Sequence, residues 1–91
     1  MKTIDIIFND EGYSDEFVSD LTIWCKEHDI PTDKVITAMV EDNVDDIDYF
    51  VVTVNHTLFS YLMWKEYGMS LRYGSEGWNR YIESSYNCEI A

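Results

Sequence analysis

The chain has 91 residues, of which 46% are hydrophobic and 15% aromatic; this supports one compact domain, residues 1–91, and leaves no room for two. Eighteen acidic residues face six basic ones. The formal net charge of −12 excludes direct nucleic-acid binding, because attraction to phosphates requires clustered Lys and Arg. The same charge disfavours docking on an anionic membrane, and the longest apolar run, residues 50–54, is too short to cross one.

The first third of the chain predicts a strand followed by a helix. Apolar and polar residues alternate over residues 3–8, as in a half-buried strand. Residues 9–12 indicate a turn, and Ser14 is the expected N-cap of a helix that ends before Pro31. Four apolar residues share one face of this helix: Phe17, Leu21, Trp24 and Cys25.

Two strands and an acidic connection are expected next. Residues 35–40 fit a strand or a short helix, and their β-branched side chains favour the strand. Residues 41–48 contain five acids and predict a solvated loop or hairpin connection. Residues 49–54 are the clearest strand, and they are too apolar for an exposed edge.

The remaining residues predict a helix, a short strand and a final helix. Asn55 or Thr57 can cap the first helix, and Gly68 is a natural residue to end it. Residues 69–73 alternate as a strand, and residues 74–77 break the chain. Two sets of residues are expected to point inward from the helices: Phe59, Leu62, Met63 and Tyr67, then Trp78, Tyr81, Ile82 and Tyr86. The order β-α-β-β-α-β with an additional C-terminal helix predicts an α+β fold of the ferredoxin-like type.

The acidic charge is concentrated in one half of the sequence. Residues 1–48 have a balance of −11, whereas residues 49–91 have a balance of −1 and contain ten of the fourteen aromatic residues. A charge that served only solubility would not need this asymmetry, so we expect a localised acidic face that binds a basic protein surface. The expected partner-binding residues are Asp10, Glu11, Asp15, Glu16, Asp20, Glu27, Glu41, Asp42, Asp45, Asp46 and Asp48.

Metal and RNA-binding motifs match poorly. The run from Asp42 departs from a calcium loop at positions 3, 6 and 12, where it has Val44, Ile47 and Thr53. Cys25 and His28 lack a second paired ligand spacing for zinc. An RNA-recognition motif requires basic residues where the third expected strand is acidic. No metal, cofactor or RNA is therefore expected.

Catalytic motifs are also missing from the sequence. It contains neither a glycine-rich phosphate loop nor a nucleophile elbow, and its two histidines fit no triad pattern. A small enzyme would require a pocket that shifts the pKa of a carboxyl or a histidine, which a solvated acidic run does not provide. The start of the chain lacks the long apolar segment of a signal peptide, and Cys25 and Cys88 do not form a disulfide framework. We therefore expect a non-enzymatic cytoplasmic protein with reduced thiols.

In size, acidity and compactness the chain resembles the small phage-encoded DNA-mimic inhibitors, which include anti-restriction and anti-CRISPR proteins. The resemblance is one of overall character, and it rests on Asp10-Glu11, Asp15-Glu16, Asp20, Glu41-Asp42 and Asp45-Asp46. It implies an inhibitor that occupies the nucleic-acid-binding surface of a nuclease or a related machine in a bacterial host.

An alternative is an interaction or assembly module, including a homodimer, that uses aromatic surface from residues 49–91. Trp78 and Tyr81 would then anchor the interface. Salt distinguishes the two hypotheses, because it weakens charge-driven binding and has little effect on aromatic contacts.

Overall fold

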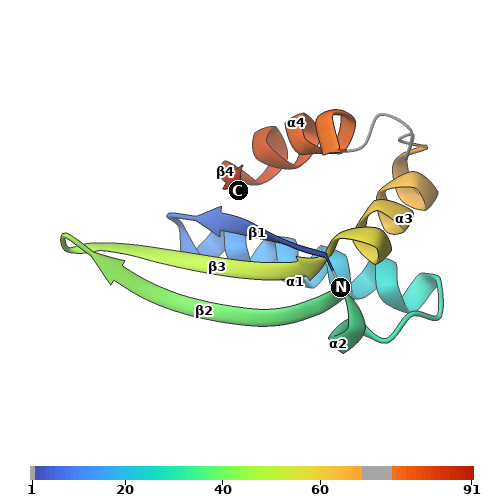
Figure 1. Ribbon diagram of the computed structural model, residues 1–91, viewed down its shortest axis with the longest axis horizontal. Coiled ribbons are helices and arrows are strands. Elements are labelled where there is room, and N and C mark those ends of the chain that lie inside the picture. The colour runs from blue at the N-terminus through green and yellow to red at the C-terminus, as the bar shows by residue number, and fades with distance from the viewer. Residues whose placement is uncertain (1, 69–74) are drawn as a thin grey trace.

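One antiparallel sheet, packed against helices, organises the chain (Figure 1). The structure is a computed structural model, and it describes residues 2–68 and 75–91. The elements, in chain order, are β1 (Thr3–Phe8), α1 (Glu11–Glu27), α2 (Thr32–Val35), β2 (Ile36–Val44), β3 (Ile47–Asn55), α3 (His56–Tyr67), α4 (Ser75–Tyr86) and β4 (Cys88–Ile90). The predicted α+β class is confirmed, as a compact domain with a four-stranded antiparallel sheet and several helices.

The strand order is β2-β3-β1-β4, and each neighbouring pair is antiparallel. β3 pairs with β1 from Asn55 to Phe50 and with β2 from Val54 to Ile47. The prediction of an interior strand at residues 49–54 is therefore confirmed, because β1 and β2 pair with the two sides of β3. β2 and β4 lie at the two edges of the sheet.

The core lies between the helices and one face of the sheet. Alternate residues of β1 and β3 point into it, and their neighbours do not: Ile6 and Val52 are buried, whereas Asp5 is exposed. The ring of Phe17, from α1, is fully buried at the centre of an aromatic cluster. Its centroid lies 5.5 Å from Phe8, 5.9 Å from Phe59 and 5.2 Å from Tyr86, so it joins α1 to β1, α3 and α4. Among the described residues, no helix is long and apolar enough to span a membrane.

The N-cap of α1 differs from the predicted one. A side-chain oxygen of Asp10 accepts hydrogen bonds from the backbone N–H groups of Gly12 and Tyr13, at 2.8 and 3.4 Å. Ser14 lies inside the helix and is buried, so the expected cap at Ser14 is wrong. Of the expected turn at residues 9–12, only residues 9 and 10 connect β1 to α1, and residues 11 and 12 belong to the helix. The reason is local: Asp is as good a cap as Ser, and the earlier cap extends the helix by one turn.

Residues 35–40 divide between two elements. Val35 ends the short helix α2, and β2 then runs on to Val44, well beyond the predicted end of the strand. The strand preferred for this segment is thus confirmed from Ile36 onward. Residues 41–44, which include the acids Glu41 and Asp42, belong to the strand because they pair with β3, so only Asp45 and Asp46 form the connection.

The end of the chain differs more from its prediction. The cap at Asn55 and the termination of α3 at Gly68, whose φ is 64°, are confirmed. The strand predicted over residues 69–73 lies outside the described residues. Helix α4 begins at Ser75, inside the predicted break, and it is followed by β4, where a C-terminal helix was expected to end the chain. Asn87, with φ 48°, ends α4 in the left-handed conformation and directs the chain into β4.

Candidate partner-binding site

The β2–β3 hairpin projects beyond the rest of the sheet, as its tip at the left of Figure 1 shows. Its strands pair up to Val44 and Ile47, so two residues, Asp45 and Asp46, form the connection. All residues from 41 to 48 are exposed. The hairpin therefore presents five of the predicted binding carboxylates to solvent: Glu41, Asp42, Asp45, Asp46 and Asp48.

Both turn residues adopt left-handed backbone conformations. The φ angles of Asp45 and Asp46 are 53° and 63°, as a two-residue type I′ turn requires. Asn followed by Gly fits this backbone best, because glycine has no Cβ to collide with the carbonyl. Two adjacent aspartates add like-charge repulsion to the conformational strain. The tip therefore combines two negative charges with a backbone conformation that glycine would favour.

A turn replacement tests this reading. We expect the double variant Asp45→Asn, Asp46→Gly to raise the free energy of unfolding by about 0.5–1 kcal/mol, because it relieves strain and repulsion together. Urea unfolding followed by circular dichroism measures the change. The variant Asp45→Asn, Asp46→Asn removes the same charge without glycine and should show a smaller gain. A double variant less stable than the wild type would contradict the assignment of strain to this turn.

Hydrogen bonds fix the acidic residues beside the turn. The Asn43 side-chain amide donates to Oδ1 of Asp48 across the hairpin at 2.7 Å, and the Asn43 backbone N–H donates to Oδ1 of Asp42 at 2.9 Å. Each bond removes conformational freedom from a carboxylate that would otherwise move in solvent. The tip is therefore partly preorganised, which reduces the entropy lost when a partner binds.

A groove connects the hairpin to the start of α1. Glu11 and Asp15 from α1 and Glu41 from β2 contribute its carboxylates. Met39, Phe50 and Val52 contribute apolar surface to the same lining, and the depression has a volume of about 200 Å³. A Lys or Arg side chain suits this arrangement, because its hydrocarbon part can cover apolar surface while its charged end meets carboxylates.

The hairpin also exposes large apolar side chains that the sequence analysis assigned to no binding role. The exposed fractions of Met39, Val40, Val44 and Ile47 are 59%, 56%, 50% and 50%. These four are half of the large hydrophobic residues that the described chain leaves exposed. The available signal was the mixing of apolar and acidic residues over residues 39–47, which we divided between a predicted strand, residues 35–40, and a solvated loop or hairpin connection, residues 41–48.

We define the acidic hairpin surface as the carboxylates of the hairpin and of the start of α1: Asp10, Glu11, Asp15, Glu41, Asp42, Asp45, Asp46 and Asp48. Asp10 also caps α1, so it has a structural role besides its charge. Glu16 is exposed on α1 but does not line the groove. Two other predicted residues, Asp20 and Glu27, contact different parts of the protein.

Asp20 joins α1 to α4. The hydroxyl of Tyr86 donates to its Oδ2 at 2.6 Å, and both side chains are partly or fully removed from solvent. Two effects raise the pKa of Tyr86 above its ordinary value: burial of the phenol is the larger, and this hydrogen bond is the next. The carboxylate of Asp20 is thereby engaged within the protein.

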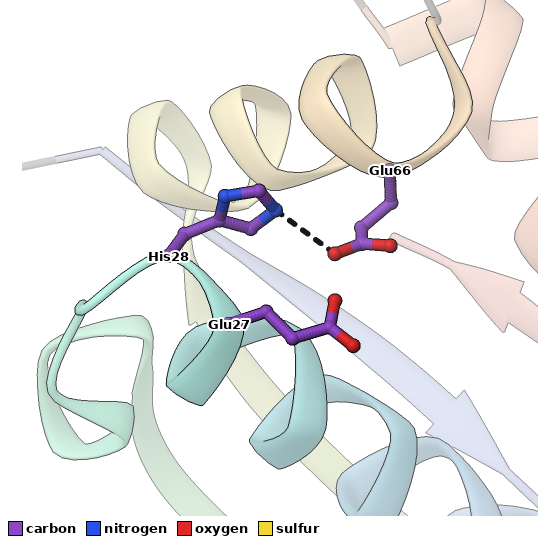
Figure 2. A group of neighbouring side chains, drawn as sticks. All are labelled: Glu27, His28 and Glu66. Atoms are coloured by element: carbon purple, nitrogen blue, oxygen red, sulfur yellow. Dashed lines mark hydrogen bonds and ion pairs between the residues drawn. The ribbon is translucent and has the colours of Figure 1, made fainter.

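Glu27 lies at the other end of α1, beside His28 and Glu66 (Figure 2). His28 Nε2 lies 2.9 Å from Oε1 of Glu66, a contact that ties the end of α1 to α3. A hydrogen bond shared with Glu66 raises the pKa of Glu27, and repulsion between the two carboxylates raises it further. The three ligand atoms lie within 4.8 Å of one another, and their residue types can bind a divalent cation. Glu27 is exposed, and the side chains of His28 and Glu66 are hydrogen-bonded to each other. The cluster is therefore explained as a contact between α1 and α3.

A second depression, of about 370 Å³, lies at the ends of β1 and β4 and includes Cys88 in its lining. Burial raises the pKa of the Cys88 thiol to about 11, and the charge of Glu83 adds to the shift. Burial also raises the pKa of Cys25. Both cysteines are free, and at neutral pH they are protonated and therefore weak nucleophiles.

Trp78 cannot anchor an interface, which corrects one expectation. It is 1% exposed, and its ring packs against Phe59 at 5.0 Å. Tyr81 is half-buried against Tyr67, with centroids 4.5 Å apart. The exposed large aromatics described in the second half are Trp64, at 45%, and Tyr67, at 39%, both on α3.

The structure thus gathers acidic and apolar groups at one end of the molecule, where the hairpin meets the start of α1. The remaining predicted acids contact α3 or α4, or lie outside the groove. Comparison of the chain with protein-family models, curated proteins and solved structures finds no match.

Proposed function

We propose that the protein is a non-enzymatic inhibitor that binds a basic protein surface through the acidic hairpin surface. The single observation that supports this proposal most directly is the groove, where carboxylates from α1 and β2 surround apolar side chains. Within the proposal, the partner is a nuclease or related nucleic-acid-binding machine, and the protein acts in a bacterial cytoplasm as a DNA mimic. The ferredoxin-like arrangement is part of the same proposal, with β1 and β2 on either side of β3.

Electrostatics favours such a partner over others. A net charge of −12 on 91 residues repels DNA and anionic lipid and attracts basic surfaces over about a Debye length, ~10 Å at 0.1 M salt. Duplex DNA offers about one negative charge per 1.7 Å of its axis, so a groove that binds it already contains clustered Lys and Arg. The acidic hairpin surface presents carboxylates at a projecting tip, and a tip of this kind can enter the DNA-binding groove of a partner.

The alternative, an assembly module with aromatic contacts, retains one supporting observation. Trp64 is 45% exposed on α3, and the ammonium group of Lys65 lies 4.7 Å from its ring centroid. A homodimer through this face predicts association that changes little between low and high salt. Sedimentation of the protein alone at both salt concentrations separates this alternative from the proposal.

Displacement from DNA tests the proposal. Proteins of a bacterial extract are bound to immobilised duplex DNA at about 50 mM salt, and the purified protein is then added. We expect it to release a DNA-binding protein at low salt and to lose this effect as salt rises. The variant Glu11→Gln, Asp15→Asn, Glu41→Gln should need at least about tenfold more protein for half release, equivalent to about 1.4 kcal/mol of binding.

The matched control is Asp29→Asn, Asp33→Asn, Glu89→Gln, which removes the same charge from exposed positions that do not line the groove. We expect it to release the DNA-binding protein within about threefold of the wild-type concentration, since only long-range attraction is reduced. Equal losses in the two variants would show that total charge, and not the groove, drives binding. A wild-type protein that releases nothing would rule out DNA mimicry for the proteins in the extract.

A further inference from the structure

The outer side of β2 is an open sheet edge. β2 is the first strand in the order β2-β3-β1-β4, and no strand pairs with its outer side among residues 2–68 and 75–91. It runs for nine residues, and every side chain after Ile36 is exposed. Alternate backbone N–H and C=O groups of an edge strand point outward and lack partners in the sheet, so they are free to pair with another strand.

This edge lacks several of the features that commonly prevent pairing. Protected edges have lysine, proline or short strands, and residues 36–44 include none of Lys, Arg and Pro. One register shift occurs, between Ile36 and Ala38, which leaves the stretch from Ala38 to Val44 in regular pairing with β3. The opposite edge, β4, is only three residues long. Of the two edges, β2 is therefore the one suited to an added strand.

Side chains along β2 determine which strand fits. Successive residues point to opposite faces, so Met39 and Glu41 lie on one face and Val40 and Asp42 on the other. Each face thus offers one apolar and one acidic side chain in sequence, and the turn adds Asp45 and Asp46 at the end. An extended segment with both apolar and basic side chains matches this pattern on both faces.

Charge favours one of the two candidates for the strand that pairs with β2. A second copy of this chain could also add its β2, but each copy has a charge of −12, and the pairing would bring Glu41 and Asp42 of one copy close to acids of the other. Like charges placed opposite each other destabilise strand pairs. A basic segment gains attraction at the same positions.

We propose that β2 binds an extended basic segment of the partner by strand addition, so that the partner becomes a fifth strand of the sheet. This inference rests on the proposed function and specifies how the acidic hairpin surface is used. Backbone hydrogen bonds to β2 supply affinity, and the groove beside Met39 and Glu41 receives a basic side chain.

Three synthetic peptides test the proposal. The first is an eight-residue peptide that repeats Lys-Lys-Val-Val and has blocked ends, so that each of its faces carries both residue types. The other two are the same peptide N-methylated at alternate residues, one along each edge. N-methylation removes backbone donors along one edge and leaves the charge unchanged. We expect the unmodified peptide to bind at low salt and to shift the NMR signals of residues 38–44. We expect the N-methylated peptides, one for each edge, to include one that binds at least about tenfold more weakly.

A protein variant provides the second measurement. Val40→Lys places a positive charge beside the edge, whereas Ile23→Lys places one on α1 at a similar exposed fraction, 51% against 56%. We expect Val40→Lys to reduce peptide affinity at least about tenfold and Ile23→Lys to change it less than about threefold. Circular dichroism confirms that both variants are folded.

The outcomes separate the two proposals. Equal binding of the unmodified and N-methylated peptides, or signal shifts confined to residues outside β2, would overturn strand addition. If such binding were still weakened by neutralising Glu11, Asp15 and Glu41, the acidic surface would remain a binding site that uses side chains alone. Failure of the unmodified peptide to bind would also overturn strand addition, while the DNA-displacement experiment tests the proposed function separately.

Discussion

Replacing Phe17 by Ala is expected to lower the free energy of unfolding by about 3–5 kcal/mol, the largest effect we predict for a single residue. Its ring is completely buried and contacts the rings of Phe8, Phe59 and Tyr86, which come from three other elements. Alanine removes the ring and leaves a cavity that these neighbours, fixed in their own elements, can fill only in part. The free energy of unfolding of a whole domain is about 5–15 kcal/mol, so the variant should be partly unfolded near 37 °C.

Chemical unfolding of the variant and of two companions measures the effect. Phe17→Leu retains apolar volume and should lose less than half as much stability. Tyr13→Ala removes an aromatic ring from the same helix at a position that is 37% exposed, and it should change stability by less than about 1 kcal/mol. If Phe17→Ala and Tyr13→Ala had similar stabilities, Phe17 would not occupy the centre of the core.

Tyr86→Phe is expected to lower the free energy of unfolding by about 1.5–3 kcal/mol, because a hydrogen bond to a charged acceptor is lost while the ring remains. The hydroxyl donates to Asp20 at 2.6 Å, and without it the half-buried carboxylate loses a donor that water replaces incompletely. The ring contact with Phe17 does not involve the hydroxyl, so the packing of α4 on α1 should persist.

A double-mutant cycle identifies the interaction. Asp20→Asn retains an acceptor for the Tyr86 hydroxyl and should lose less stability than Tyr86→Phe, and the two changes combined should be clearly non-additive. Additive losses would show that the charge of Asp20 adds nothing to its hydrogen bond with Tyr86. The cycle also tests the expectation that Asp20 binds a partner: an Asp20→Asn variant that folds normally but binds the partner poorly would restore that role.

Local patterns in the sequence were sufficient for most of the elements. Alternation predicted β1, and the apolar run of residues 49–54 predicted the interior position of β3. Helical spacing predicted the buried face of α1, and Asn55 and Gly68 predicted the limits of α3. These signals are local because a strand or helix places its apolar residues at fixed intervals along the chain. The prediction failed where two residues compete for one role, as with Asp10 and Ser14 at the start of α1. It also failed at β4, which is too short to show a period.

The candidate site was predictable as a list of charged residues and not as an arrangement. Residues 41–48 were assigned to a connection because their polarity suggested a loop, but pairing with β3 holds two of their five acids, Glu41 and Asp42, in β2. Burial likewise separated the aromatic residues, since Trp78 lies in the core and Trp64 at the surface. Neither distinction is encoded within one short segment.

By itself, the sequence determined the strong negative charge, its concentration in residues 1–48 and the apolar faces that form the core. The tertiary structure decided which carboxylates act together. It placed Glu11 and Asp15 beside Glu41, directed Asp20 to Tyr86, and left Glu27 beside Glu66 at the far end of α1. The physical reason is that charge is a property of residues, whereas a binding surface depends on strand register and helix packing between segments distant in the chain.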